Sequence, residues 1–224
     1  MALPGFFSIH HTFFTVLDYR MSYLEFAGTS LSLAAVWLAA RNHILNWPVG
    51  NVAVILFAIL FFQVQLYSDF VEQIYFLATG CYGWWVWHSG GMAGELRITS
   101  NGARRNLACG AIILAGTMLL GHAMSHIHEH LPRLFPQPAA FPYLDALTTV
   151  MSFAANLLMA FRKIECWYLW IAVDVIGVGL YFSRGIRFVA LLYLIFLAIA
   201  ARGLWRWRVQ WRQLQPGAAA FAGS

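Results

Sequence analysis

The sequence predicts an all-α membrane protein with seven transmembrane helices, arranged as two parallel three-helix repeats joined by a linking helix. Of its 224 residues, 61% are hydrophobic and only 10% are charged, and Lys163 is the single lysine. A soluble domain of this size could not hydrate so apolar a surface. Seven apolar stretches are each long enough to cross a bilayer as a helix. The two ends of the chain also resemble each other, which predicts the repeat.

The internal repeat becomes visible when the sequence is shifted by 120 residues. Across residues 23–87, 18 of 65 positions are then identical, where roughly five matches are expected by chance. Trp47 falls on Trp167, and the Gly-x-Trp-x-Trp sequence at 83–87 falls on the one at 203–207. Because a single helix separates the two units, the second unit enters the membrane in the same direction as the first. In proteins built from such parallel repeats, the ligand site lies near the midplane where the repeats meet.

The predicted elements follow one another in a simple order. Residues 1–22 form an N-terminal interfacial segment, which is either a short helix containing Phe6, Phe7, Phe13 and Phe14 or a disordered start. It lacks the basic start and the small-residue cleavage site of a signal peptide. The first repeat occupies 23–88, the linker with its helix 89–142, the second repeat 143–207 and a cytoplasmic tail 208–224. We expect helices over 23–40, 47–66, 70–87, 107–123, 143–161, 166–182 and 188–204.

The distribution of basic residues predicts the orientation in the membrane. Ten lysine and arginine residues fall on the side that holds the C-terminus, and four fall on the opposite side. Because cytoplasmic loops are enriched in these residues, the C-terminus is expected in the cytoplasm and the N-terminus outside. The formal net charge of +5 therefore concerns topology, and we expect no nucleic-acid partner.

One face of the predicted helix 166–182 combines aromatic rings with a carboxylate. Trp167, Trp170 and Asp174 fall within about 60° of one another, and Tyr181 returns to the same face two turns later. Asp174 falls near the membrane midplane, where an ionisable group costs roughly 2.5–3.5 kcal/mol and therefore usually faces a cavity, a partner or a ligand. A carboxylate beside two indoles suits a flat cationic ligand. A purely structural bond of Asp174 is the alternative.

Amide side chains on three other predicted helices extend this candidate substrate site. Gln73 lies inside the helix 70–87, where its donors and acceptors need partners. Asn51 and Asn156 either bind ligand or hydrogen-bond between helices. Asp69, at the outer end of its helix, is expected to be an N-cap residue instead.

Two further sets of residues have simpler interpretations. Tryptophans near the cytoplasmic boundary are expected to form an aromatic belt at the membrane surface; they are Trp47, Trp84, Trp85, Trp87, Trp205 and Trp207. The histidines near the opposite boundary either bind a metal or lie in a solvated loop before a proline-rich stretch; they are His122, His126, His128 and His130.

Motifs for catalysis are missing from the sequence. It contains no phosphate-binding loop of an ATP-driven pump and no metalloprotease or serine-hydrolase motif. We therefore expect neither enzymatic activity nor a cofactor. The alternative from another class is a membrane-embedded metal or haem protein that uses the histidines.

Four short sequences spread over residues 23–207 together carry a family resemblance. They are Gln63-x-Gln65-Leu66-Tyr67, Gln73 with Tyr82-Gly83-Trp84-x-x-Trp87, Ala140-Phe141-Pro142-Tyr143-x-Asp145, and Arg162-Lys163-x-Glu165-x-Trp167-x-x-Trp170. In these sequences the chain resembles the PnuC-type vitamin transporters, which carry nicotinamide riboside and related compounds. The resemblance implies a three-one-three helix arrangement like that of SWEET sugar transporters. It also implies facilitated diffusion, with net uptake driven by a cytoplasmic kinase that traps the substrate by phosphorylation.

The resemblance further implies what the site binds. The Trp-x-x-Trp element belongs to the substrate site in members that carry nicotinamide riboside, which implies this role for Trp167 and Trp170. Those members tend to have asparagine after the element, whereas this chain has Asp174. Nicotinamide riboside and thiamine both contain a cationic aromatic ring, while riboflavin is neutral and larger. We therefore expect a nicotinamide riboside facilitator in the inner membrane, with thiamine or another vitamin or nucleoside-like substrate as the alternative. We also expect small homo-oligomers.

Overall fold

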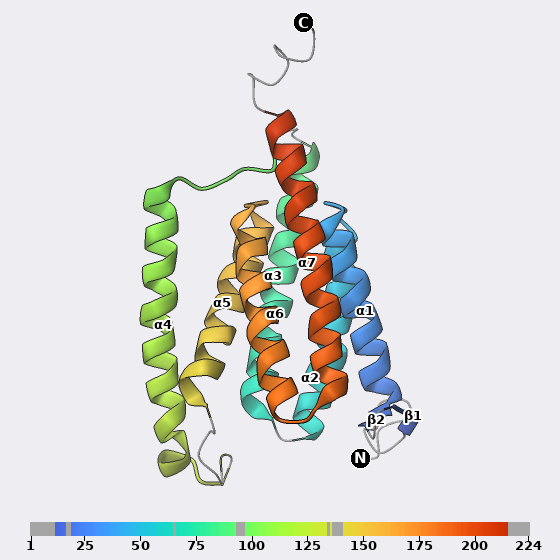
Figure 1. Cartoon of the computed structure of the whole chain (residues 1–224), viewed down its shortest axis with the longest axis vertical. Helices are drawn as coiled ribbons and strands as arrows, with labels where there is room; N and C mark the ends of the chain where they lie inside the picture. Colours follow the sequence, from blue (N-terminus) through green and yellow to red (C-terminus); the bar gives the residue numbers. More distant parts are fainter. Residues whose placement is uncertain are drawn as a thin grey trace, which may run out of the picture.

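Seven long helices make up most of the structure. The computed structural model describes residues 12–16, 19–64, 66–92, 97–133, 135 and 141–214. A short antiparallel hairpin of β1 (Thr12–Val16) and β2 (Tyr19–Ser22) precedes the helices. They are α1 (Tyr23–Ala40), α2 (Asn46–Gln63), α3 (Tyr67–Met92), α4 (Ala103–His130), α5 (Pro142–Ala160), α6 (Glu165–Ser183) and α7 (Arg187–Gln213), which run side by side in Figure 1. The expected all-helical architecture is confirmed.

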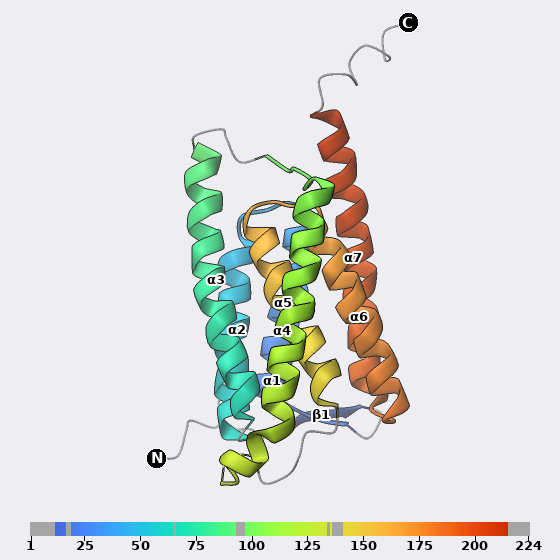
Figure 2. The same ribbon diagram turned by 90° about the vertical axis from the view of Figure 1, so that its left-hand side faces the viewer.

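Six of these helices form a closed ring. Helices α1, α2, α3, α5, α6 and α7 each pack on the next, and α7 packs on α1. Helix α4 packs on α5 at the edge of the bundle and lies in front of it in Figure 2. All the described helices except α3 are long and apolar enough to cross a membrane by length and composition. The chain is therefore a multi-pass membrane protein.

Three helices extend beyond the expected apolar stretches, and one of them is α7, which continues to Gln213. Helix α3 continues to Met92, and α4 runs from Ala103 to His130. The additional turns contain glycine, arginine and histidine residues, which an apolar pattern does not detect. His122, His126, His128 and His130 therefore lie on the last turns of α4, and the interpretation as a loop is wrong. Asp69 lies in the first turn of α3, inside the helix and not at its N-cap.

The described part of the N-terminal segment is a hairpin, so the alternative of an interfacial helix is wrong there. Residues Thr12–Val16 are β-branched or aromatic, which favours a strand. The hairpin leads into α1 through Ser22, whose hydroxyl accepts a hydrogen bond from the Glu25 N–H at 3.2 Å. Tyr19 stacks on Phe188 of α7, with 5.2 Å between ring centroids. Residues 1–11, including Phe6 and Phe7, lie outside the described residues.

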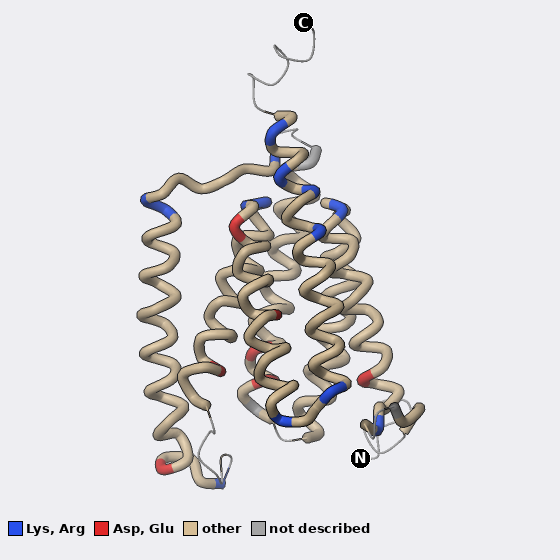
Figure 3. The backbone as a smooth tube through the Cα atoms, viewed as in Figure 1, with Lys and Arg blue, Asp and Glu red and all other residues tan. Residues whose placement is uncertain are grey.

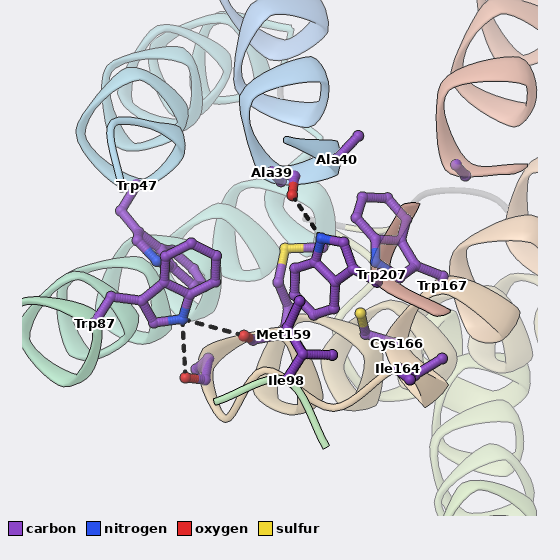
Figure 4. Packing of buried hydrophobic residues seen from close by; sticks show 12 residues of the cluster. Ala39, Ala40, Trp47, Trp87, Ile98, Met159, Ile164, Cys166, Trp167 and Trp207 are labelled. Carbon is purple, nitrogen blue, oxygen red and sulfur yellow. Dashed lines mark hydrogen bonds between the residues drawn. The ribbon is translucent and has the colours of Figure 1, made fainter. Parts of the chain in front are cut away.

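Four tryptophans form the centre of the largest buried cluster, and we call Trp47, Trp87, Trp167 and Trp207 the tryptophan core (Figure 4). Trp47 meets Trp87 edge to face with 5.6 Å between ring centroids, and Trp167 meets Trp207 in the same way at 5.5 Å. Such aromatic pairs contribute about 0.5–1.5 kcal/mol beyond their area burial. The two pairs correspond to each other under the shift of 120 residues.

Two glycines make room for these indoles. A Cβ atom on Gly83 would lie 2.5 Å from the Trp47 ring, and a Cβ on Gly203 would lie 2.8 Å from the Trp167 ring. Both distances are shorter than any real side-chain contact, so only glycine allows α3 and α7 to approach α2 and α6 so closely. This explains why the repeat keeps Gly and Trp together.

The tryptophan core also carries hydrogen bonds that cross between the two halves of the chain. The Trp87 indole N–H donates to the carbonyl oxygens of Met159 and Ala160, at 3.3 Å and 3.1 Å. The Trp207 indole N–H donates to the Ala39 carbonyl oxygen at 3.1 Å. Helix α3 is thereby joined to the end of α5, and α7 to the end of α1. Donors and acceptors correspond under the shift of 120 residues.

The turns that follow α1 and α5 match each other as well. Asn42 has φ = 56° and Arg162 has φ = 50°, a left-handed conformation that is uncommon for residues other than glycine. In each turn, the N–H of the next residue donates to the carbonyl oxygen five positions earlier, at 3.0 Å and 2.9 Å. The Arg162 guanidinium lies 4.2 Å from the centroid of the Trp87 ring, and burial lowers the pKa of this guanidinium.

The expectation of an aromatic belt is wrong for half of the tryptophans assigned to it. Trp47, Trp87 and Trp207 are buried, at most 5% exposed. Trp84, Trp85 and Trp205 are exposed on the surface, where belt residues belong. Proximity to the membrane boundary predicts the level of a side chain along its helix, but not whether it faces lipid or protein.

Gly203→Ala should destabilise the protein, because the new methyl group would overlap the Trp167 ring. Overpacking of this kind costs about 1–3 kcal/mol, which thermal unfolding in detergent would detect as a lower Tm. Gly110→Ala on α4 is the matched control, since a Cβ there meets nothing within 4 Å and alanine favours the helix. Equal Tm values for the two variants would contradict the packing role of Gly203.

Candidate functional site

Asp174 lies in the middle of α6 and is only 6% exposed. One turn further along α6, Gly177 allows the Tyr193 ring of α7 to pack directly against the helix. Tyr193 lies close enough to interact electrostatically with Asp174, and also with Glu72 and Asp69 of α3. Asp174 of α6 and Tyr193 of α7 are therefore coupled electrostatically, and Tyr193 is coupled to α3 as well.

Tyr181 and Tyr193 form the aromatic part of this region. Their rings stack with 5.3 Å between centroids and an interplanar angle of 23°. Asp69 and Asp145 interact electrostatically with Tyr181. Tyrosines and carboxylates from four helices thus interact electrostatically in this region. We call them the acidic–tyrosine cluster, which consists of Asp69, Glu72, Asp145, Asp174, Tyr181 and Tyr193.

The charges of the bundle are segregated along its length. Figure 3 shows Asp and Glu on neighbouring helices α3, α5 and α6 in the half away from the C-terminus. Lys and Arg gather mostly at the other end, near the C-terminal end of α7. Arg184, at the end of α6, is a positive charge that acts on Asp145 and Tyr181. A region with this acidic excess attracts cations.

Trp167 lies in the tryptophan core and not in the acidic–tyrosine cluster. It is fully buried against Gly203 and Trp207, and its indole N–H has no hydrogen-bond partner among the described residues. A ligand reaches this ring only if the packing around it opens. Stacking of a ligand on Trp167 therefore stays a prediction, and its role in this structure is packing.

Trp170 is the tryptophan closer to Asp174. It is half-buried and packs against the edge of the tryptophan core. At a rise of about 1.5 Å per residue, Trp170 and Asp174 are about 6 Å apart along the helix, and Trp167 and Asp174 about 10 Å. Of the two tryptophans, Trp170 is therefore the better placed to contact a ligand that pairs with Asp174.

The two asparagines have partners on other helices. Asn156 of α5 donates to the Thr79 hydroxyl of α3 at 2.7 Å, and this hydroxyl donates to the Tyr75 carbonyl oxygen at 2.8 Å. Asn51 of α2 donates to the Cys81 sulfur at 3.6 Å and packs against Gly80. Of the two alternatives for these side chains, the structure thus shows hydrogen bonding between helices.

Two members of the acidic–tyrosine cluster, Tyr193 and Glu72, were not expected from the sequence. Gln73 is half-buried on α3, the helix that also holds Asp69 and Glu72. Under the shift of 120 residues, Gln73 corresponds to Tyr193. The internal repeat therefore pointed to Tyr193 as the counterpart of the candidate residue Gln73. Glu72 had no such signal, because its position in the helical period places it away from Gln73.

The histidines of α4 lie at the periphery. The rings of His122 and His126 are 4.6 Å apart, and His126 Nδ1 is 2.8 Å from the Ser125 hydroxyl. Within the described part of the chain, no three His, Cys, Asp or Glu side chains come together as a metal site.

Comparisons with known proteins cover almost the whole chain. The family model described as nicotinamide mononucleotide transporter matches residues 22–209. The nicotinamide riboside transporter PnuC of Escherichia coli is 31% identical over 206 residues, which are 84% of this chain and 86% of that protein. The riboflavin/roseoflavin transporter RibM of Streptomyces davaonensis is 26% identical over 204 residues, which cover 89% and 91% of the two chains.

A solved structure has the same fold. The crystal structure of the vitamin B3 transporter PnuC matches with a TM-score of 0.67 at 22% identity, covering 86% of this chain and 83% of that one. The relatives named here are all described as transporters. The family match, the identity to the Escherichia coli protein and the shared fold show that this chain belongs to the nicotinamide mononucleotide transporter family.

Proposed function

We propose that this protein carries nicotinamide riboside across the membrane by facilitated diffusion. The observation that carries the proposal is the 31% identity to the nicotinamide riboside transporter of Escherichia coli over nearly the full length of both chains. The acidic–tyrosine cluster adds a chemical reason, because the nicotinamide ring of this substrate has a permanent positive charge. Stacked aromatic rings beside carboxylates bind such a ring through cation–π contact and charge pairing.

The helices of this transporter form two parallel three-helix units, residues 23–88 and 143–207, with α4 as the link. Support comes from features that correspond under the shift of 120 residues: the edge-to-face tryptophan pairs, the indole hydrogen bonds and the left-handed turns. Rocking of one unit against the other exposes a midplane site to each side in turn.

Recognition of the substrate centres on Asp174. In the low-dielectric interior its carboxylate offsets the charge of the nicotinamide ring, while Trp170 and Tyr181 offer faces for stacking. Gln73, Asn51 and Asn156 hydrogen-bond the polar substituents, the two asparagines after exchanging their interhelical partners for ligand. Trp167 joins the site only in a conformation in which its packing has opened.

The direction of net uptake comes from chemistry on the inner side. The excess of Lys and Arg on the side of the C-terminus supports a cytoplasmic C-terminus and an N-terminus outside. A cytoplasmic kinase then phosphorylates the substrate, which adds negative charge and prevents its return. The transporter itself needs no ATP, and it works as a small homo-oligomer in the inner membrane.

Thiamine is the second candidate substrate, because it also carries a cationic aromatic ring and fits the same carboxylate. The similarity to a riboflavin transporter extends the range of ring systems within the family. Riboflavin is neutral, so a buried carboxylate gives it no advantage.

Asp174→Asn should weaken binding of nicotinamide riboside about 30-fold, since loss of one buried charge partner costs about 2 kcal/mol. The reduced, uncharged form of nicotinamide riboside is the matched ligand, and its affinity should change little. Titration of both ligands in detergent measures the difference. Glu129→Gln, an exposed carboxylate on α4, controls for removal of charge elsewhere. Equal losses for both ligands would show that Asp174 is structural.

Trp170→Ala should lower the affinity for nicotinamide riboside about tenfold through loss of a stacking face. Trp167→Ala should instead lower the free energy of unfolding by about 3–5 kcal/mol, because it leaves a cavity in the tryptophan core. Parallel measurements of Kd and Tm separate the two roles, with exposed Trp205→Ala as the control. An unchanged Kd for Trp170→Ala would remove this residue from the site.

Liposomes that contain the purified protein should equilibrate labelled nicotinamide riboside without ATP and without an ion gradient. The internal concentration should rise only to the external one. Labelled thiamine is assayed in the same vesicles to decide between the two substrates. Accumulation above the external concentration in response to a proton or sodium gradient would refute the facilitator mechanism.

A further inference from the structure

A groove on the outside of the helix ring has a chemical character unlike the substrate site. It lies between α1 and α7 and has a volume of about 430 Å³. Its apolar part is lined by Leu194 and Ala198, and its other part by Arg41, Arg202 and Arg206. Trp37 and Ala198 are exposed, so the groove opens toward the surroundings of the bundle and not into the ring.

The three arginines come together because of where α1 ends. Arg41 is the C-cap of α1, and its guanidinium lies 3.6 Å from the centroid of the Trp37 ring. Arg202 and Arg206 are one turn apart on α7 and line the same groove. Among the described residues that line it, none is Asp or Glu. The positive charges therefore face the groove without a carboxylate in its lining.

The corresponding place in the other half of the bundle lacks these charges. Under the shift of 120 residues, Arg41, Arg202 and Arg206 correspond to Phe161, Tyr82 and Val86. Those residues belong to the end of α5 and to α3, which pack together as α1 and α7 do. The three arginines are thus present on this side of the bundle and not at the corresponding positions of the other, which supports a ligand for this groove.

We propose that the groove between α1 and α7 binds one anionic phospholipid. The helices cross the membrane, so the apolar part of the groove lies beside acyl chains and the arginines lie toward the level of the headgroups. Arg binds phosphate through paired N–H donors, and basic pockets between transmembrane helices bind anionic lipid headgroups. If the C-terminus is cytoplasmic, as proposed above, this lipid belongs to the cytoplasmic leaflet; the binding itself does not depend on that orientation.

The double variant Arg202→Gln/Arg206→Gln tests the headgroup contact. Native mass spectrometry of the purified protein, titrated with dioleoylphosphatidylglycerol or dioleoylphosphatidylcholine, measures lipid bound per chain. The phosphatidylglycerol should bind more tightly than the phosphatidylcholine, and the double variant should weaken it about 30-fold. Arg104→Gln/Arg105→Gln on α4 removes the same charge from exposed positions outside the groove and should leave binding unchanged.

Ala198→Trp tests the apolar part without changing any charge. It fills the groove at an exposed position and should abolish binding of the phosphatidylglycerol while the Tm stays close to that of the parent protein. Equal binding of both lipids, or equal losses in the two double variants, would overturn the proposal. A shift from oligomer to monomer in Ala198→Trp would also overturn it, because the groove would then be a contact between copies of this chain.

Discussion

The hydrogen bonds that Trp87 and Trp207 donate across the bundle are the interactions on which the remaining architecture depends. The last carbonyl groups of an α-helix have no partner within the helix, and in a membrane an unpaired carbonyl is costly. Each indole N–H adds a donor at the end of α1 or α5, where the Ala39 and Met159 carbonyl oxygens also accept a backbone N–H from the turn that follows. Since lipid gives helices no hydrophobic reason to associate, such bonds and close packing decide how they pair. Gly83 and Gly203 make the close packing possible.

The two ends of the bundle consequently differ in character. The end with the tryptophan core is closely packed, and its helices are joined by aromatic contacts and indole hydrogen bonds. The opposite half holds the acidic–tyrosine cluster, whose carboxylates interact electrostatically with Tyr181 and Tyr193, with Arg184 as a nearby positive charge. A pivot near the tryptophan core would leave the acidic half free to change its spacing, which suits the proposed movement around a cationic substrate.

Much of the fold followed from the sequence, because bilayer thickness fixes helix length and a duplicated sequence fixes helix order. The limits of α1 were predicted to the residue, whereas α3, α4 and α7 extend through polar turns that lie outside the apolar pattern. The tryptophans were harder, since position near a boundary does not distinguish a lipid-facing ring from a buried one. Trp47, Trp87 and Trp207 turned inward because glycines and helix-end carbonyls receive them.

The candidate site was predictable only in its charged component. Asp174 was identified because a carboxylate in a membrane helix is costly without a partner or ligand, and in the structure it interacts electrostatically with Tyr193. The helix period placed Trp167 and Asp174 on one face of α6. In the structure Trp167 packs into the tryptophan core, whereas Asp174, about two turns further along, does not belong to that core. Contacts among α3, α6 and α7 depend on how the helices pack together, and the pattern along one helix does not predict them.

Gln73 and Tyr193 occupy corresponding positions in the two units but differ in chemistry. Two identical units around an axis would present the same side chain twice, and a ligand on that axis would bind equally well in either of two opposite poses. Joining the units in one polypeptide allowed these two positions to diverge into an amide and a phenol. Nicotinamide riboside has a charged base at one end and a sugar at the other. In the proposed arrangement the different side chains at these two positions therefore favour one binding orientation of the substrate over the opposite one.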